Sequence, residues 1–107
     1  MMRQRFMRVL VFFDLPVETK MDRRNYSKFR KFLLEDGFVM MQKSVYSKIV
    51  LNGHASELVA DRIRNHKPSD GKIQILTITE KQFQSIEYVL GEPQNDIIDC
   101  QTRLVVL

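Results

Sequence analysis

The sequence has little of what small cross-linked or metal-stabilised domains require. It contains a single cysteine, Cys100, among 107 residues. One cysteine excludes an internal disulfide and a cysteine-based zinc site, and it fits a reducing compartment. We therefore expect a cytoplasmic protein that is stabilised by its packed core. Because a chain of this length buries only a modest core, association with another copy would add stability.

Long hydrophobic runs are also missing, and this argues against a membrane partner. No apolar stretch reaches the length that spans a bilayer. Arg3 and Arg5 precede an apolar run, as in a signal peptide, but the run is short, ends in Asp-Leu-Pro and lacks a small-residue cleavage site. The sequence has no His-x-x-x-His or paired-aspartate spacing, so no preformed metal site is visible.

Positive charge, in contrast, is in excess. Lys and Arg number 17 against 13 Asp and Glu, which gives a net charge of +4 and a pI near 9.4. Such a balance suits a polyanionic partner. The 44% hydrophobic and 28% charged content is that of an ordinary globular protein, and the length predicts one domain over residues 1–107.

The opening strand is the most informative segment. Residues 6–13 are almost continuously apolar, which predicts a central strand that is covered on both faces. Asp14-Leu15-Pro16 ends the strand. Asp14 then lies at the carboxyl end of a buried strand, where open α/β sheets place their ligands. The carboxylate is either a turn cap or part of a site, and the pattern leaves both interpretations open.

The rest of the chain alternates helical and strand patterns. Thr19 and Asp22 form a capping pattern, so a helix is predicted from about Thr19 to Asp36, with Met21, Tyr26, Phe29, Phe32 and Leu33 on its apolar side and Gly37 as its cap. The sequence further predicts two strands, or one bent strand, over 38–42 and 44–51, a helix from about 55 to 67, a strand over 72–79, a weak helical turn or irregular segment over 80–91, and a last strand over 103–107.

This order of elements predicts an α+β, ferredoxin-like fold. The βαββαβ arrangement forms an antiparallel sheet with both helices on one face. The additional C-terminal strand, Arg103 to Leu107, is apolar and would be an unprotected edge in a monomer. We therefore expect a homodimer, in which residues from about 80 to 107 serve dimer or partner contacts.

The first predicted helix also has a basic face. At 3.6 residues per turn one narrow stripe opposite the apolar side holds four cations, with Arg23 and Arg30 beside it: Lys20, Arg24, Lys28 and Lys31. Such a stripe neutralises phosphates, and arginine adds bidentate phosphate donors. The alternative is a solvated lysine-rich face.

Asp14 has no second carboxylate near it in the first strand. One carboxylate alone supplies few ligands for Mg²⁺, but two copies of the chain joined by a two-fold axis would supply two carboxylates. Mg²⁺ often takes only one or two carboxylates together with waters and phosphate.

Several stretches, in the expected order over nearly the whole chain, resemble the CRISPR-associated "Cas-two" family. They are Val11-Phe12-Phe13-Asp14, Arg23-Arg24, Gly37, Gln42-Lys43-Ser44-Val45-Tyr46 and Thr77-Ile78-Thr79-Glu80-Lys81-Gln82-Phe83. Two further stretches resemble the type II branch of that family in particular: Arg30-Lys31-Phe32-Leu33-Leu34 and Ser44-Val45-Tyr46-Ser47-Lys48.

The resemblance implies a homodimer in which the two Asp14 carboxylates face each other and hold Mg²⁺. It implies a complex with the adaptation integrase that captures foreign duplex DNA and inserts it into a CRISPR array. The family is often classed as a metal-dependent endoribonuclease, and some members are described as cutting duplex DNA. The resemblance places the basic residues Arg23, Arg24 and Arg30 on nucleic acid, and Ser44 matches a family serine.

Phe13 stands where many family members carry tyrosine, which removes a hydroxyl near the implied site and favours a structural role over hydrolysis. Any cleavage would use Asp14 as metal ligand. Two other readings stay open: a free-standing ribonuclease of the toxin type on the same fold, and a dimeric regulator that binds a small molecule.

Overall fold

The structure, a computed structural model, describes residues 5–93. The predicted last strand, Arg103 to Leu107, and Cys100 lie outside the described residues, so the strand stays a prediction. The elements follow in the order β1 (Met7–Asp14), α1 (Lys20–Glu35), β2 (Val39–Gln42), β3 (Val45–Val50), α2 (Gly53–Asn65), β4 (Lys72–Thr79) and α3 (Glu80–Gln84).

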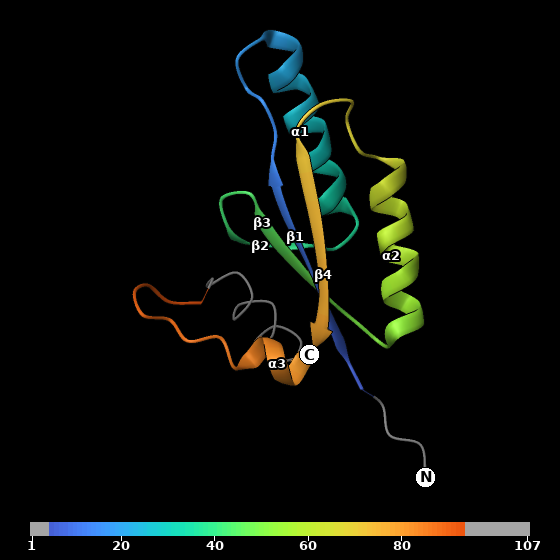
Figure 1. The fold of residues 1–107 in the computed structure, drawn as a ribbon, viewed down its shortest axis with the longest axis vertical. Coiled ribbons are helices and arrows are strands. Elements are labelled where there is room, and N and C mark those ends of the chain that lie inside the picture. Colours follow the sequence, from blue (N-terminus) through green and yellow to red (C-terminus); the bar gives the residue numbers. More distant parts are fainter. Residues whose placement is uncertain (1–4, 94–107) are drawn as a thin grey trace, which may run out of the picture.

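The four strands form one sheet in the order β2-β3-β1-β4, and each neighbouring pair is antiparallel. This confirms the predicted α+β, ferredoxin-like arrangement. It also confirms that the apolar opening strand is central, because β1 pairs with β3 on one side and with β4 on the other. Figure 1 shows α1 and α2 together on one side of the sheet, with α3 on the other.

Successive side chains of β1 point to opposite faces of the sheet. Val9, Val11 and Phe13 join the hydrophobic core with Phe29 and Leu33 of α1. We call this side of the sheet the helix-covered face. The intervening residues of β1 point to the opposite side, which neither α1 nor α2 covers and which we call the helix-free face: Arg8, Leu10, Phe12 and Asp14.

Helix α1 begins and ends as predicted. Thr19 Oγ1 accepts a hydrogen bond from the Asp22 backbone N–H while the Asp22 carboxylate accepts one from Thr19 N–H, a complete capping box. Gly37 follows the helix with φ of 103°, the left-handed cap that favours glycine. The prediction that Met21 lies on the buried side is wrong, because its side chain is 59% exposed. The first turn of α1 extends past the end of β1 (Figure 1), so it has no sheet to pack against.

Two separate strands, rather than one bent strand, follow α1. β2 and β3 form a hairpin whose turn consists of Lys43 and Ser44, between the paired residues Gln42 and Val45. Ser44 takes the left-handed conformation with φ of 66°. A non-glycine residue tolerates this conformation at a cost of about 1–2 kcal/mol, so the turn forms without the Asn-Gly sequence that usually marks it.

Helix α2 is capped by Asn52, whose side chain accepts a hydrogen bond from Ala55 N–H. Its buried residues include Ser56 and Val59, whereas Leu58, a residue of the predicted helical pattern, is exposed. The short α3 confirms the weak helical turn predicted after β4. Within residues 5–93, no helix combines the length and the apolar character needed to cross a membrane.

Candidate nucleic-acid and metal site

Asp14 lies exposed at the carboxyl end of β1, on the helix-free face, and lines a cavity of about 280 Å³. The polar side chains that share the cavity with it come from two other places in the sequence: Lys43 and Ser44 from the hairpin turn, and Lys72 and Gln74 from β4. One carboxylate and two ammonium groups therefore meet at this end of the sheet. This set of charges suits a phosphate group that is held between cations.

Strand pairing explains why these residues converge. Lys72 lies directly opposite Asp14 in the antiparallel register of β1 and β4, and Gln74 lies opposite Phe12. On the other side, Phe13 N–H donates a hydrogen bond of 3.0 Å to the Ser44 carbonyl oxygen, which fixes the hairpin turn to the end of β1. The cavity is thus held by backbone pairing on both sides of Asp14.

Gly71, just before β4, packs against the backbone next to Asp14. A Cβ at position 71 would lie 2.9 Å from the Asp14 carbonyl oxygen and 2.6 Å from Leu15 Cδ2. Gly71 also has φ of 107°, a conformation that L side chains rarely adopt. Only glycine therefore lets the loop before β4 approach the carboxylate strand this closely.

The donor set of one copy fits a magnesium ion only in part. Asp14 is the single carboxylate of the cavity, and the described part of the chain has no group of three or more His, Cys, Asp or Glu side chains that could hold a metal. Mg²⁺ needs few protein ligands when waters and substrate phosphate complete its shell. The side chains present fit a metal that is shared with a phosphate or with a second carboxylate.

Phe13 is among the residues that line this cavity, but its ring packs in the core. Its ring is buried on the helix-covered face, with centroid distances of 5.8 Å to Tyr26, 5.2 Å to Phe29 and 5.6 Å to Tyr46. Its connection to the site runs through its backbone N–H, which holds Ser44. Side-chain alternation thus separates two neighbours in sequence, Phe13 and Asp14, onto opposite faces.

The cations of α1 are exposed, but the fold does not bring them to Asp14. Helix α1 packs on the helix-covered face, whereas Asp14 points to the helix-free face. Arg23 donates through Nη1 to the carbonyls of Val17 and Glu18, at 3.2 and 2.9 Å, and so braces the loop before the helix. The other predicted cations form no ion pair among the described residues: Lys20, Arg24, Lys28, Arg30 and Lys31.

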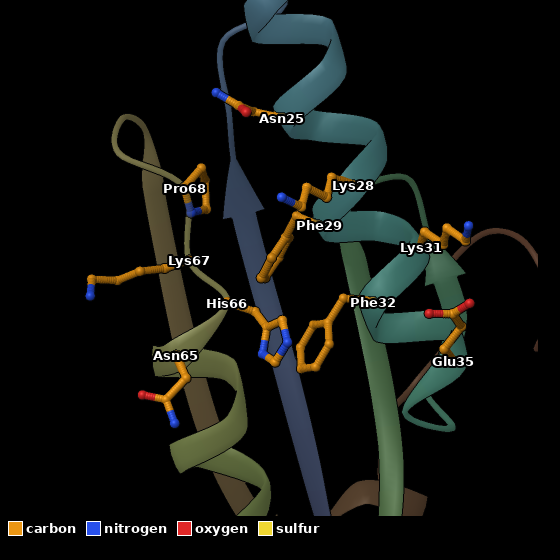
Figure 2. A pocket seen from close by; sticks show the side chains of 10 residues that line it. All are labelled: Asn25, Lys28, Phe29, Lys31, Phe32, Glu35, Asn65, His66, Lys67 and Pro68. Atoms are coloured by element: carbon orange, nitrogen blue, oxygen red, sulfur yellow. The ribbon is translucent and has the colours of Figure 1, made fainter.

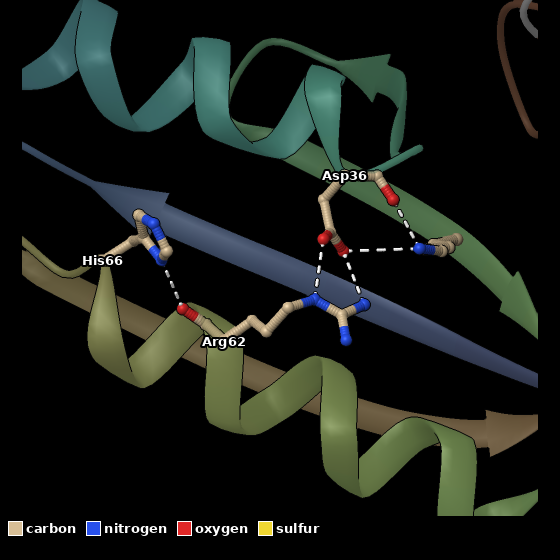
Figure 3. Close-up of polar contacts among 4 residues, drawn as sticks. Asp36, Arg62 and His66 are labelled. Carbon is tan, nitrogen blue, oxygen red and sulfur yellow. Dashed lines mark hydrogen bonds and ion pairs between the residues drawn. The ribbon is translucent and has the colours of Figure 1, made fainter.

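A polar cluster at the other end of α1 joins three elements (Figure 3). Arg62 of α2 holds Asp36 with two hydrogen bonds, of 2.7 and 3.1 Å, and Lys48 of β3 contacts both the carboxylate and the carbonyl of Asp36. Burial raises the pKa of the Asp36 carboxyl, but the hydrogen bond from Arg62 and the Lys48 ammonium outweigh burial, so the pKa lies below its ordinary value of 3.8. The cluster fixes the end of α1 to α2.

Sequence reasoning missed Lys43, Lys72 and Gln74. Lys43 adjoins Ser44, which was a candidate, and so could have been found by extending that motif across the turn. Lys72 and Gln74 stand near the start of a predicted strand, and only the pairing of β4 with β1 brings them to Asp14. The β1–β4 register carries this information, and no local pattern in the sequence reveals it.

Comparison with known proteins agrees with this architecture. The family described as "CRISPR associated protein Cas2" matches residues 7–86 of the chain. A "CRISPR-associated endoribonuclease Cas2" from Treponema denticola is 50% identical over 101 residues, which cover 94% of this chain and 100% of that protein. A protein of the same description from Streptococcus mutans strain UA159 is 46% identical over 101 residues, 94% of this chain and 93% of that protein.

One solved structure, described as "Crystal structure of cas2", superposes with a TM-score of 0.58 at 20% sequence identity. The match covers 83% of this chain and 91% of that chain. At this level of identity the likeness concerns the fold alone.

Proposed function

Because the chain belongs to the Cas2 family of CRISPR-associated proteins, we propose that it acts as a homodimer that binds duplex DNA during spacer acquisition, in a complex with the adaptation integrase. The observation that carries this proposal is the exposed basic stripe of α1, defined by Lys20, Arg24, Lys28 and Lys31, whose charges no acidic side chain among residues 5–93 neutralises.

The dimensions of the stripe suit a nucleic-acid backbone. At 1.5 Å per residue, the distance along α1 from Lys20 to Lys31 is about 16 Å. Phosphates of one DNA strand repeat every 3.4 Å along the helix axis, so the stripe runs beside roughly five of them. Contacts of this kind position a duplex without reading its sequence, as capture of varied foreign fragments requires.

The helix-free face supports the homodimer. Ile49 and Leu76 point to this face and are 47% and 49% exposed, although both are large and apolar. The segment after α3 adds Val89 and Leu90, which are also exposed. A second copy that packs on this face would bury these side chains, and it would bring a second Asp14 toward the first.

Metal-dependent cleavage of a phosphodiester is a second candidate activity, which the composition of the Asp14 cavity favours. In this proposal Asp14 holds Mg²⁺, which when bound polarises the phosphate and orients a water. Lys43 and Lys72 bind the phosphate oxygens from either side of the carboxylate, and they offset the charge that develops during cleavage. Relatives named as endoribonucleases agree with this activity.

The substitution Asp14→Asn separates the two activities. Asparagine keeps the shape and the turn-capping capacity of aspartate but removes the charge. We expect Mg²⁺-dependent cleavage by the purified protein to be lost while spacer integration in cells stays close to wild type. Loss of integration, with dimer and complex intact, would show that the metal site serves integration. Cleavage that persists in the variant would remove Asp14 as the catalytic ligand.

Duplex binding is tested at the end of the basic stripe farthest from the sheet. The double variant Lys20→Ala/Arg24→Ala should weaken binding and lower the slope of log affinity against log salt by about 1.8, or 0.9 for each lost phosphate contact. Lys81→Ala, which removes an exposed lysine from α3, is the matched control and should leave the slope unchanged. A double variant with the wild-type slope would show that the basic stripe is merely solvated.

A further inference from the structure

A groove between α1 and α2 lies apart from the Asp14 cavity and has a different composition. It has a volume of about 460 Å³, which is in the range of binding sites for small ligands. Phe29 and Phe32 reach it from α1, and His66 and Pro68 reach it from the end of α2 and the segment that follows (Figure 2). Aromatic rings thus form the bottom of a groove on the helix-covered side of the molecule.

Its central feature is a stacked pair of rings. The His66 imidazole lies parallel to the Phe32 ring, with an interplanar angle of 10° and a centroid distance of 4.0 Å. His66 Nδ1 lies 2.8 Å from the Arg62 carbonyl oxygen, so this nitrogen is the donor, and the contact fixes the orientation of the ring (Figure 3). His66 is exposed, which leaves one ring face and the Nε2 edge available to a ligand.

Three lysines line the same groove. Lys28 and Lys31 line the groove from α1 and Lys67 lines it from the other wall, against a single carboxylate, that of Glu35. Figure 2 shows the Lys28 amine directed toward the groove above Phe29. Among residues 5–93 neither Lys28 nor Lys31 has an acidic partner, so both are available to an anion.

From this geometry we infer that the α1–α2 groove binds single-stranded nucleic acid, with one base stacked on His66 and the adjacent phosphates held by Lys28 and Lys31. A positively charged groove with a planar ring is the combination that binds single strands without sequence preference, because every base has a flat face. A duplex keeps its bases paired inside and cannot offer one to His66. The groove shares Lys28 and Lys31 with the basic stripe but adds the ring of His66, which the stripe lacks, and it does not depend on Asp14.

The test uses the full-length protein and a fluorescent oligothymidylate of about ten nucleotides, with binding measured by anisotropy. His66→Ala should weaken binding of this probe about tenfold, since stacking contributes about 1–3 kcal/mol per base. Binding of a duplex of the same length should stay within about twofold of wild type. His54→Ala, which removes an exposed histidine from the first turn of α2, is the matched control and should bind both probes normally.

Two further variants separate stacking from charge and from folding. His66→Phe keeps an aromatic ring over Phe32 and should restore most of the oligothymidylate affinity. The exposed pair Lys28→Ala/Lys31→Ala should lower the salt slope for the probe by about 1.4, or 0.7 for each single-strand phosphate contact.

Wild-type affinity in His66→Ala, or equal weakening in His54→Ala, would overturn the proposal. So would His66→Phe binding as weakly as His66→Ala. If His66→Ala does not fold, a wild-type salt slope for the probe in Lys28→Ala/Lys31→Ala would overturn the proposal. The proposed duplex function is judged separately by Lys20 and Arg24, which do not line the groove.

Discussion

The two faces of the sheet are stabilised by different interactions. On the helix-covered face, aromatic and aliphatic side chains such as Phe13, Phe29 and Leu33 pack into one core. On the helix-free face, the buried Arg8 forms an ion pair with Glu80 of α3 and lies 4.0 Å from the centre of the Phe83 ring. One face is complete within the single chain, whereas the other combines a polar clamp with exposed apolar side chains. The contrast agrees with the proposal that a second copy packs on the helix-free face.

Substituting one leucine on each face by alanine tests how much each face contributes to the free energy of unfolding. Leu33→Ala should lower the free energy of unfolding by about 2–5 kcal/mol, because it leaves a cavity in the core. Leu76→Ala on the helix-free face should cost less than about 1 kcal/mol, because its side chain is already 49% exposed. Urea denaturation at low protein concentration measures both. Equal losses would show that the helix-free face is as tightly covered as the other.

The ion pair of the helix-free face should matter more than an exposed one. The side chains of Arg8 and Glu80 are only 10% and 18% exposed, so Glu80→Ala leaves a desolvated arginine and should cost about 3 kcal/mol. Asp61→Ala breaks the Arg64 pair on α2, whose side chains are more than half exposed, and should cost less than about 1 kcal/mol. Denaturation of both variants under the same conditions tests this. Similar small losses would mean that Arg8 is hydrated in place.

A pair of glycine substitutions tests how closely the loop before β4 must approach Asp14. Gly71→Ala places a Cβ against Asp14 and Leu15 in a left-handed conformation, and it should cost about 2 kcal/mol and lower any Asp14-dependent cleavage. Gly53→Ala, where a Cβ meets nothing within 4 Å at the start of α2, should stabilise by about 0.5–1 kcal/mol. Thermal unfolding and nuclease assays check both. A harmless Gly71→Ala would show that the loop before β4 can retreat from the carboxylate.

The contribution of the Asp36 cluster to stability depends on pH. The folded-state pKa of Asp36 is lowered, so its contribution is present above the ordinary value of 3.8 and is lost as pH falls through the folded-state pKa. Asp36→Asn should cost about 1.5 kcal/mol at pH 7, as expected for hydrogen bonds to a charged group. The difference from wild type should shrink below about pH 4. A difference that stays constant over an acid titration would contradict the ionic role of this residue.

Much of the fold could be predicted because helix caps and strand alternation depend on short stretches of the sequence. The capping box at Thr19, the glycine after α1 and the alternation along β4 each depend on a few consecutive residues. Met21 was misplaced because helical periodicity does not say where the sheet ends. The hairpin turn was uncertain because Ser44 takes a conformation that serine seldom adopts.

Only part of the candidate site could be predicted, because some of its residues are far apart in the sequence. Asp14 could be found because a buried strand ends there, but its neighbours Lys72 and Gln74 come from strand register, which is a long-range property. The basic stripe of α1 was visible as a helical pattern. That it lies on the other side of the sheet from Asp14 follows from tertiary packing, which places α1 on the helix-covered face.

The central position of β1 also affects the order of events during synthesis. β1 is made first, yet β4, one of its two partner strands, is the last strand made among residues 5–93, and the Arg8–Glu80 contact joins residues 72 positions apart. At about 5–20 residues per second, a ribosome needs roughly 4–14 s to make that interval. During this time the most apolar strand of the sheet lacks β4 on one side, and an unpaired apolar strand is prone to aggregate. Pairing of β1 on both sides therefore has to wait until β4, the last strand among residues 5–93, has been made.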